Sequence, residues 1–238
     1  MKKGNRSGKP TPIIALKGVS RDFPVANGIV WALKNVDLDI YPRDFLVIYG
    51  PSGCGKSTLL NLITGIDKPT RGEVIFQDNA FSKLPADKRS YIRAKNFGVI
   101  YQTAWWVKSL NVLDNVALPL YISGEKERRA QERARAILDE LKVLDLKTQC
   151  PTELSSGQQQ RISLARALVT DPSIIVADEP TGNLDTTSSD TMMGHLDYLN
   201  KEAGKEIVLV THNAAYWELG TRSVEMLDGE IVKRSMRE

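Results

Sequence analysis

The part of the chain best suited to chemistry is a glycine-rich loop between an apolar run and a helix-forming segment. Residues 50–57 read Gly-Pro-Ser-Gly-Cys-Gly-Lys-Ser and fit the pattern G-x-x-x-x-G-K-[ST]. Glycines let backbone N–H groups turn towards anionic oxygens, and the N-terminus of the next helix adds partial positive charge. Lys56 is placed to reach the β- and γ-phosphates, and Ser57 to bind Mg²⁺. The residues predicted to hold a nucleoside triphosphate are Gly50, Pro51, Ser52, Gly53, Cys54, Gly55, Lys56, Ser57 and Thr58.

Two adjacent carboxylates follow a second apolar run. Residues 173–177 indicate a buried strand, and Asp178 and Glu179 come directly after it. In an open α/β sheet, ligands bind at the carboxyl ends of the strands. We therefore expect Asp178 to help hold Mg²⁺ and Glu179 to accept a proton from the water that attacks the γ-phosphate. Acidic residues also end strands simply to be hydrated, so the prediction depends on the glycine-rich loop as well.

The composition excludes several classes of protein. Of the 238 residues, 42% are hydrophobic and 26% are charged, and the net charge of +3 is too small to indicate a nucleic-acid binder. The two cysteines exclude a disulfide framework. The apolar runs are far shorter than the about 20 residues of a membrane-spanning helix. Residues 1–12 carry four basic residues without an apolar segment after them, which predicts a flexible basic tail and not a secretory signal.

The elements that must position these residues are strands towards both ends of the chain and a helical block between them. From about residue 107 to residue 170, apolar side chains recur at steps of three and four, which indicates helical faces. This order predicts an α/β core with a helical insertion. Alternating or continuous apolar runs predict strands at 13–16, 36–40, 45–49, 73–77, 97–101, 173–177, 206–210 and 222–227.

Further motifs follow one another in a fixed order, and together they resemble the ATP-binding cassette (ABC) ATPases. Residues 154–158 read Leu-Ser-Ser-Gly-Gln and resemble the signature of that family. Gln102 resembles its Q-loop glutamine, residues 182–185 its D-loop and His212 its switch histidine. The resemblance extends from about residue 12 onward, and residues 114–120 and 178–185 are similar to the MacB/LolD/FtsE group. Importer ATPases and antimicrobial-peptide resistance systems are close alternatives within the family.

The resemblance implies a fold, an activity and partners. The fold would be an α/β P-loop NTPase (ABC ATPase) core over residues 13–238, with an N-terminal antiparallel β region and a helical subdomain of about residues 103–170 inserted in the RecA-like part. The chain would hydrolyse ATP with Mg²⁺, form a homodimer on ATP binding, and act on a separate transmembrane permease without contacting nucleic acid. It would then lie in the cytoplasm, on the inner face of the membrane. The permease would determine the transported substrate.

The resemblance also assigns roles around the nucleotide. Phe23 would stack on adenine, although it is also suited to a core position, and Trp31 is an alternative stacking residue. Gln102 would join Ser57 and Asp178 as a metal ligand and contribute to catalysis with Glu179. His212 would contact the γ-phosphate and also act in catalysis.

Other roles apply across the expected dimer. Ser155, Gly157 and Gln158 would hold the ATP bound to the phosphate loop of the other subunit, and Asp185 would lie at the interface. A helix predicted over residues 158–169 places its N-terminus at this signature, and Ser155 also suits an ordinary N-cap. Ser156 stands where the family usually has glycine, so its side chain would either crowd the γ-phosphate or add a hydroxyl to it.

Two adjacent tryptophans, Trp105 and Trp106, follow Gln102. One hypothesis places one of them in a groove that receives a helix of a membrane partner. The other places both within this chain, one buried and one packed at an edge.

Two other functions share the same phosphate loop. A soluble ABC ATPase acting on DNA or ribosomes would usually carry a long coiled coil or two cassettes, and this chain shows neither pattern. A phosphoryl-transferring kinase would not need the signature or His212. ATP hydrolysis without an acceptor, and without stimulation by DNA, would distinguish the transporter ATPase from both.

Overall fold

The strands of the described residues form two separate sheets. The computed structural model describes residues 11–26 and 28–236, so the predicted tail at residues 1–12 lies largely outside the described residues. In this part of the chain, a three-stranded antiparallel sheet has the order β2-β1-β4, and a six-stranded sheet has the order β5-β6-β7-β3-β8-β9. The smaller sheet consists of β1 (Ile14–Val25), β2 (Gly28–Ile40) and β4 (Arg71–Phe76). The larger consists of β3 (Phe45–Tyr49), β5 (Phe97–Ile100), β6 (Ile174–Asp178), β7 (Glu206–Val210), β8 (Arg222–Leu227) and β9 (Glu230–Met236).

Strands β5, β6, β7, β3 and β8 run parallel, and β9 closes the edge antiparallel to β8. β3 and β7 are buried along their whole length, which explains why β3 is apolar throughout and why β7 is apolar after its first residue, Glu206. Successive side chains of a strand point to opposite faces. Phe45 and Val47 accordingly belong to one apolar core, and Leu46 and Ile48 to another on the opposite face.

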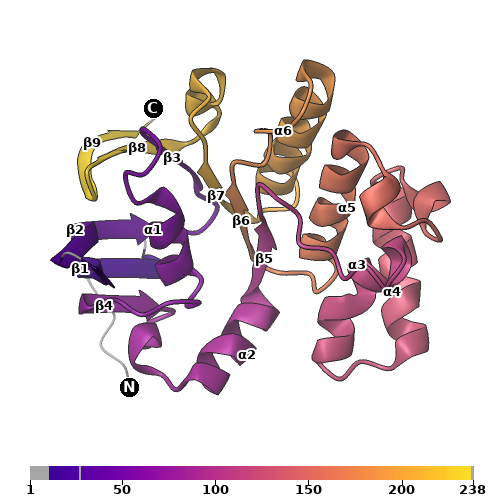
Figure 1. Ribbon diagram of the computed structural model, residues 1–238, viewed down its shortest axis with the longest axis horizontal. Helices are drawn as coiled ribbons and strands as arrows, with labels where there is room; N and C mark the ends of the chain where they lie inside the picture. Colours follow the sequence, from indigo (N-terminus) through magenta and orange to yellow (C-terminus); the bar gives the residue numbers. More distant parts are fainter. Residues whose placement is uncertain (1–10, 27, 237–238) are drawn as a thin grey trace.

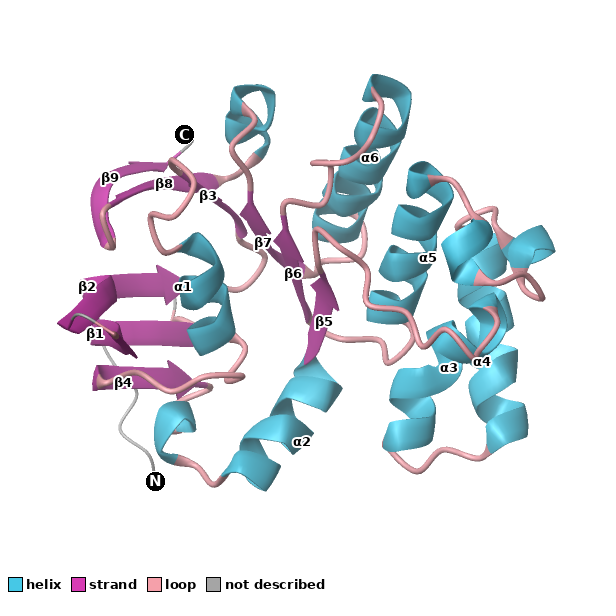
Figure 2. Cartoon of the chain, in the orientation of Figure 1, coloured by secondary structure: helices cyan, strands magenta, loops and turns pink. Residues whose placement is uncertain are grey.

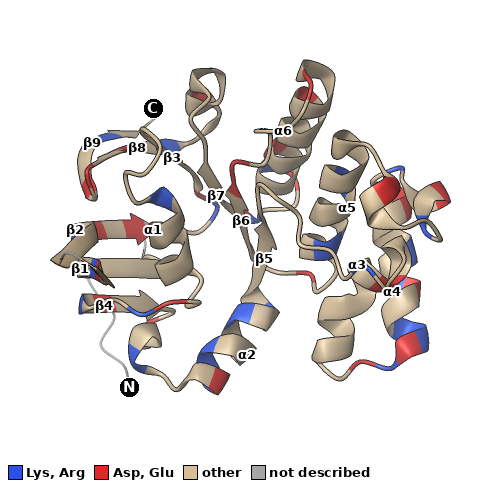
Figure 3. Ribbon diagram, in the orientation of Figure 1, with Lys and Arg blue, Asp and Glu red and all other residues tan. Residues whose placement is uncertain are grey.

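The helices form layers on the two faces of the larger sheet, as Figures 1 and 2 show. Helix α1 lies in the core shared with the smaller sheet, while α3, α4, α5 and α6 contribute to the core on the other face. Charged residues are frequent along α2 and α4 (Figure 3). The helices are α1 (Lys56–Ile63), α2 (Ala86–Asn96), α3 (Val112–Ile122), α4 (Glu127–Glu140), α5 (Ser156–Leu168) and α6 (Thr186–Lys201). Short 3₁₀ turns are η1 (Phe81–Lys83), η2 (Leu144–Leu146), η3 (Pro151–Glu153) and η4 (Ala214–Leu219).

The α/β fold with an N-terminal antiparallel sheet is confirmed, and between β5 and β6 the regular elements are helical. The predicted bounds of β3, β7 and β8 are also confirmed. Three expectations need correction: β1 and β2 are much longer than predicted, and α5 begins at Ser156 and not at Gln158. None of the helices over the described ranges 11–26 and 28–236 is long and apolar enough to cross a membrane.

Candidate functional site

Four neighbouring parallel strands bring the predicted chemistry to one edge of the larger sheet. β5, β6, β7 and β3 lie side by side in that order, so their carboxyl ends meet at the same edge. The segments leaving these ends carry Gln102, Glu179, His212 and the phosphate loop respectively. Residues that are far apart in the sequence are therefore gathered by strand order alone.

The phosphate loop has a backbone that only glycine can adopt at its critical points. Gly50 and Gly55 have φ angles of +151° and +104°, in the region that disfavours side chains. A Cβ atom at Gly50 would collide with the carbonyl oxygen of Met226, and one at Gly55 with that of Ala32. Gly55 also caps α1, so the free N–H groups of the first turn face the space enclosed by the loop.

Lys56 lies folded over its own loop. Its side chain is buried, and its Nζ donates hydrogen bonds of 2.9 Å to the carbonyl oxygens of Gly50 and Pro51. Its Nζ also lies 4.0 Å from the sulfur of Cys54, which is buried inside the loop. The ammonium group is thus held at the mouth of the anion-binding loop.

Asp178 and Ser57 form the pair expected to hold a metal ion. The Ser57 hydroxyl hydrogen-bonds to the Asp178 carboxylate. Burial raises the pKa of Asp178, the charge of Glu179 raises it further, and the Ser57 hydrogen bond and the Lys56 charge oppose the change. Among the described residues, no group of three or more His, Cys, Asp or Glu could hold a metal ion. The donors fit Mg²⁺, which commonly takes one or two protein oxygens together with water and nucleotide phosphates.

Asp178→Asn is expected to raise the melting temperature by about 2–4 °C while abolishing Mg²⁺-dependent hydrolysis. A raised pKa means that the ionised carboxylate destabilises the fold at pH values above its unfolded-state pKa, and asparagine removes that charge. Thermal denaturation at pH 7 in EDTA would measure the effect. The difference should shrink as the pH falls and Asp178 becomes protonated in both states.

Asp185→Asn is the matched control, because its shift has the opposite sign. Hydrogen bonds from the backbone and hydroxyl of Ser188 lower the pKa of Asp185, so its ionised form stabilises the fold above its unfolded-state pKa. This variant should melt at a lower temperature at pH 7. If Asp178→Asn were also less stable, burial would not be the dominant influence on Asp178.

Glu179 and His212 form a hydrogen-bonded pair. Nδ1 of His212 lies 2.9 Å from Oε1 of Glu179, and the backbone N–H of His212 donates to Oε2 at 3.3 Å. The Glu179 side chain is 13% exposed, whereas that of His212 is 63% exposed. Glu179 also has a φ of +49°, a strained conformation for a residue with a side chain. The backbone conformation of Glu179 therefore orients its carboxylate, and the ring and backbone N–H of His212, after β7, hold it in place.

Gln102 lies on the other side of this carboxylate-bearing turn. Its Nε2 would be 3.1 Å from a Cβ placed on Gly182, so it packs against the turn that follows β6. It shares a cavity with Pro180 and Asn183. The structure thus brings Gln102 to the predicted D-loop, and its role as a metal ligand stays a prediction.

The signature begins a helix with a complete capping box. Ser155 is the N-cap of α5: its hydroxyl accepts from the backbone N–H of Gln158 at 3.3 Å, and its own N–H donates to Oε1 of Gln158 at 3.0 Å. Ser156 is exposed in the first turn. The N-cap interpretation of Ser155 is confirmed, and the free end of α5 also suits an anion.

Gly157 connects this helix to the predicted D-loop. A Cβ on Gly157 would lie 2.6 Å from the hydroxyl oxygen of Ser188, so α5 and α6 approach closely only because this residue is glycine. Ser188 donates from its hydroxyl to Asp185 at 2.8 Å and from its N–H at 2.9 Å. The sequence gives no signal for Ser188, because its position depends on the packing of two distant helices.

The predicted adenine-stacking residues lie on the β1–β2 hairpin. Phe23 is 37% exposed, and the Arg21 guanidinium lies 4.5 Å from its ring centroid. Trp31 is half-buried beneath Arg71 at 5.2 Å. Ala32, next to Trp31, contacts the phosphate loop through its carbonyl group at Gly55. Trp31 is thus next to a residue that contacts the loop, and Phe23 lies farther along the same hairpin, so the choice between them stays open.

The two tryptophans have different environments. Trp106 packs against the helical core, donates through Nε1 to Gln159 at 2.9 Å, and has the Arg166 guanidinium 4.4 Å from its ring centroid. Trp105 is 74% exposed and is held through its carbonyl group, which accepts from Arg166 at 2.6 Å. Its side chain lines an apolar groove of about 360 Å³ together with Leu118, Pro119 and Ile122 of α3.

The comparisons with known proteins agree with this geometry. Residues 33–182 match the family model described as ABC transporter. The chain is 40% identical over 223 residues to the uncharacterised ABC transporter ATP-binding protein MJ0796 of Methanocaldococcus jannaschii, covering 92% of this chain and 95% of that protein. It is 35% identical over 221 residues to the lipoprotein-releasing system ATP-binding protein LolD of Hyphomonas neptunium, covering 93% and 97%.

A larger relative and a solved structure extend the comparison. The chain is 40% identical to the macrolide export ATP-binding/permease protein MacB of Wolinella succinogenes, covering 94% of this chain but only 34% of that protein. The structure superimposes on the dimeric post-hydrolysis structure of MJ0796 bound to ADP and Pi, with a TM-score of 0.89, 37% identity, and coverage of 94% and 99%.

Proposed function

The chain belongs to the ABC transporter ATP-binding family and is an ATPase, and from this premise we propose that two copies close around two ATP molecules and drive a separate membrane permease. Each ATP would lie between the phosphate loop of one subunit and the signature helix of the other. The permease would perform export, lipoprotein or peptide extrusion, or mechanotransmission, with this chain on its cytoplasmic side. The transporter names of the relatives favour this function over action on DNA or ribosomes.

The observation that carries the proposal is the separation of the two helix N-termini. Helix α1, which follows the phosphate loop, packs in the core on one face of the six-stranded sheet. Helix α5, which begins within the signature, packs in the core on the opposite face (Figure 1). The sheet separates the two helices, so the N-termini of α1 and α5 in one subunit would not bind the same triphosphate. A triphosphate that lies between two subunits would contact α1 of one subunit and α5 of the other, and each helix N-terminus would then have an anionic ligand. The dimeric relative bound to ADP and Pi supports this arrangement.

The residues at the strand ends have complementary tasks in hydrolysis. Lys56 would exchange the carbonyl oxygens of Gly50 and Pro51 for phosphate oxygens. Glu179 would accept the proton of the attacking water, and His212 would hold that carboxylate in place. Mg²⁺ bound at Ser57 and Asp178 would neutralise phosphate charge.

Mixing two differently inactivated chains tests the shared site. In a Glu179→Gln background, Lys56→Ala should prevent ATP-dependent self-association, and so should Ser156→Glu, which places a carboxylate against the triphosphate. A helix N-terminus tolerates an acidic residue, so Ser156→Glu should fold. A mixture of the two should form heterodimers with one intact composite site. Differently tagged chains retained together only with ATP would confirm this, and retention of either variant with itself would contradict it.

The groove beside Trp105 is the proposed contact with the permease. Its apolar residues come from the loop after β5, from α3 and from α5, and the loop is anchored by the buried Asn115. Asn115 accepts from the N–H of Val107 at 3.0 Å and donates to its carbonyl group at 3.1 Å. A partner helix seated there would touch the segment that also carries Gln102. Movement of the partner would then reach the nucleotide site through a short loop.

Trp105→Ala is expected to leave the melting temperature and the basal ATPase rate of the isolated chain unchanged, because its side chain is mostly exposed. Stimulation of ATP hydrolysis by the co-purified permease in vesicles should fall at least about tenfold, as for a central interface aromatic. Trp106→Ala is the matched control and should lower the melting temperature, since it removes core packing and a hydrogen bond. Normal stimulation of Trp105→Ala would contradict the proposed contact.

A further inference from the structure

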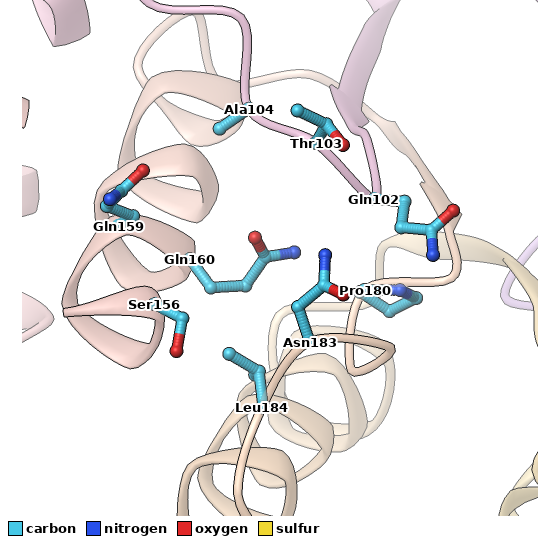
Figure 4. Close-up of a pocket in the computed structure, with 9 residues that line it drawn as sticks. All are labelled: Gln102, Thr103, Ala104, Ser156, Gln159, Gln160, Pro180, Asn183 and Leu184. Atoms are coloured by element: carbon cyan, nitrogen blue, oxygen red, sulfur yellow. The ribbon is translucent and has the colours of Figure 1, made fainter. Parts of the chain in front are cut away.

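A small polar cavity lies where three segments of the chain meet. It has a volume of about 170 Å³ and is walled by the loop after β5, the first turns of α5 and the turn after β6 (Figure 4). The amide side chains of Gln102, Gln159, Gln160 and Asn183 line it. The helical layer and the catalytic edge of the sheet therefore face each other across one space.

Gln160 brings an unpaired amide to this cavity. The residue is 6% exposed, and its Nε2 is sealed from solvent and has no hydrogen-bond acceptor. In Figure 4 the amide nitrogen of Gln160 points across the cavity towards the amide nitrogen of Asn183, so Asn183 would present its oxygen as an acceptor after its amide turns over. A buried donor without an acceptor is unfavourable, so an arrangement that supplies an acceptor becomes more stable.

The neighbouring Gln159 shows the contrast. Its Nε2 donates to the carbonyl oxygen of Leu154 at 2.9 Å, and its Oε1 accepts from Trp106 at 2.9 Å. The two successive amides on α5 thus differ. Gln159 is hydrogen-bonded within the helical layer, whereas Nε2 of Gln160 is free to bond to an acceptor from the opposite wall of the cavity.

We propose that Gln160 is a positioning residue for the ATP-bound dimer, whose Nε2 donates to Oδ1 of Asn183 when two subunits close on ATP. This inference rests on the proposed function, because closing on a shared ATP is what would press α5 against the turn after β6. Asn183 lies between Glu179 and Asp185 in that turn. A hydrogen bond to it joins the signature helix of a subunit to the turn that carries its own catalytic carboxylate.

Gln160→Met separates this role from a structural one. Methionine keeps the length of the side chain and removes the unpaired amide, so the melting temperature without nucleotide should stay the same or rise. In a Glu179→Gln background, dimerisation should require about tenfold more ATP, because the closed state loses one buried hydrogen bond. Analytical ultracentrifugation over an ATP titration would measure the dimer fraction.

Two further variants complete the test. Gln159→Met should lower the melting temperature without nucleotide, since it breaks two existing hydrogen bonds. Asn183→Ala should weaken dimerisation like Gln160→Met, and combining the two should add little, as expected for partners in one bond. Unchanged ATP dependence of Gln160→Met, or a lowered melting temperature like that of Gln159→Met, would overturn the inference. Failure of the Glu179→Gln parent to dimerise would instead overturn the proposed function and this inference with it.

Discussion

Glu179→Gln is expected to reduce ATP hydrolysis by about 10³-fold while leaving ATP binding intact. A carboxamide cannot accept the proton of the attacking water, but it has nearly the shape of the carboxylate that His212 holds through its ring and its backbone N–H. Phosphate release measures the loss, and binding of a fluorescent ATP analogue measures what remains. Because bound ATP is no longer consumed, the variant should elute from size-exclusion chromatography as a dimer when ATP and Mg²⁺ are present.

The same change at an exposed glutamate provides the control. Glu202 is exposed between the end of α6 and the start of β7, at the opposite edge of the sheet from the strand ends that gather the site, and Glu202→Gln should hydrolyse ATP at the parental rate. If Glu179→Gln also did so, the assignment of the general base would be wrong. If it bound ATP yet stayed monomeric, the shared nucleotide site would be wrong while the base assignment survived.

Lys56→Ala is expected to weaken ATP binding by at least about 100-fold, because it removes charge-assisted hydrogen bonds to phosphate oxygens. In this structure the ammonium group is already at the loop, bonded to the carbonyl oxygens of Gly50 and Pro51. Equilibrium binding of a fluorescent ATP analogue would measure the change. Loss of hydrolysis at subsaturating ATP should follow from the loss of affinity.

A second substitution at Lys56 distinguishes charge from loop shape. Lys56→Gln retains a donor for the loop carbonyls without the positive charge, so it should preserve the melting temperature better than alanine but bind ATP equally poorly. Lys83→Ala removes an exposed lysine that pairs with Glu73 and should change neither property. ATP affinity restored in Lys56→Gln would show that the lysine acts only by shaping the loop.

The parts of the fold visible in the sequence are those where burial leaves a regular pattern. β3 and β7 are buried on both faces, and their predicted bounds match the structure: the apolar run of β3 covers the whole strand, and that of β7 covers all but its first residue, Glu206. The sequence predicts only the first part of β1. Register shifts after Leu16, Val19 and Arg21 break the alternation of side chains, so the rest of the strand shows no regular pattern. β9 and α2 escaped prediction for another reason: β9 is an almost entirely exposed edge strand, and α2 buries only Arg89.

Some parts of the candidate site can likewise be predicted from the sequence, and others cannot. The phosphate loop, Asp178, Glu179 and His212 can be predicted because each motif is continuous in the sequence and follows a strand. The supporting contacts cannot be predicted, because they join segments that are distant in the sequence. Arg166 donates to the carbonyl group of Trp105, 61 positions away, and Gly157 must lack a side chain because Ser188 packs against it. No periodicity records such pairs, because they exist only after the helical layer has packed on the sheet.

The alternation of side chains along the central strands has an evolutionary consequence. Ile175 and Ala177 of β6 support the helical layer, whereas Ile174 and Val176 support the nucleotide-binding layer, so substitutions at neighbouring positions disturb different layers. If the chain acts on a membrane partner as proposed, the face beneath the helices could change to suit a new partner while the opposite face keeps its packing around α1. The five residues of β6 thereby allow the helical layer to vary while the nucleotide-binding layer keeps its structure.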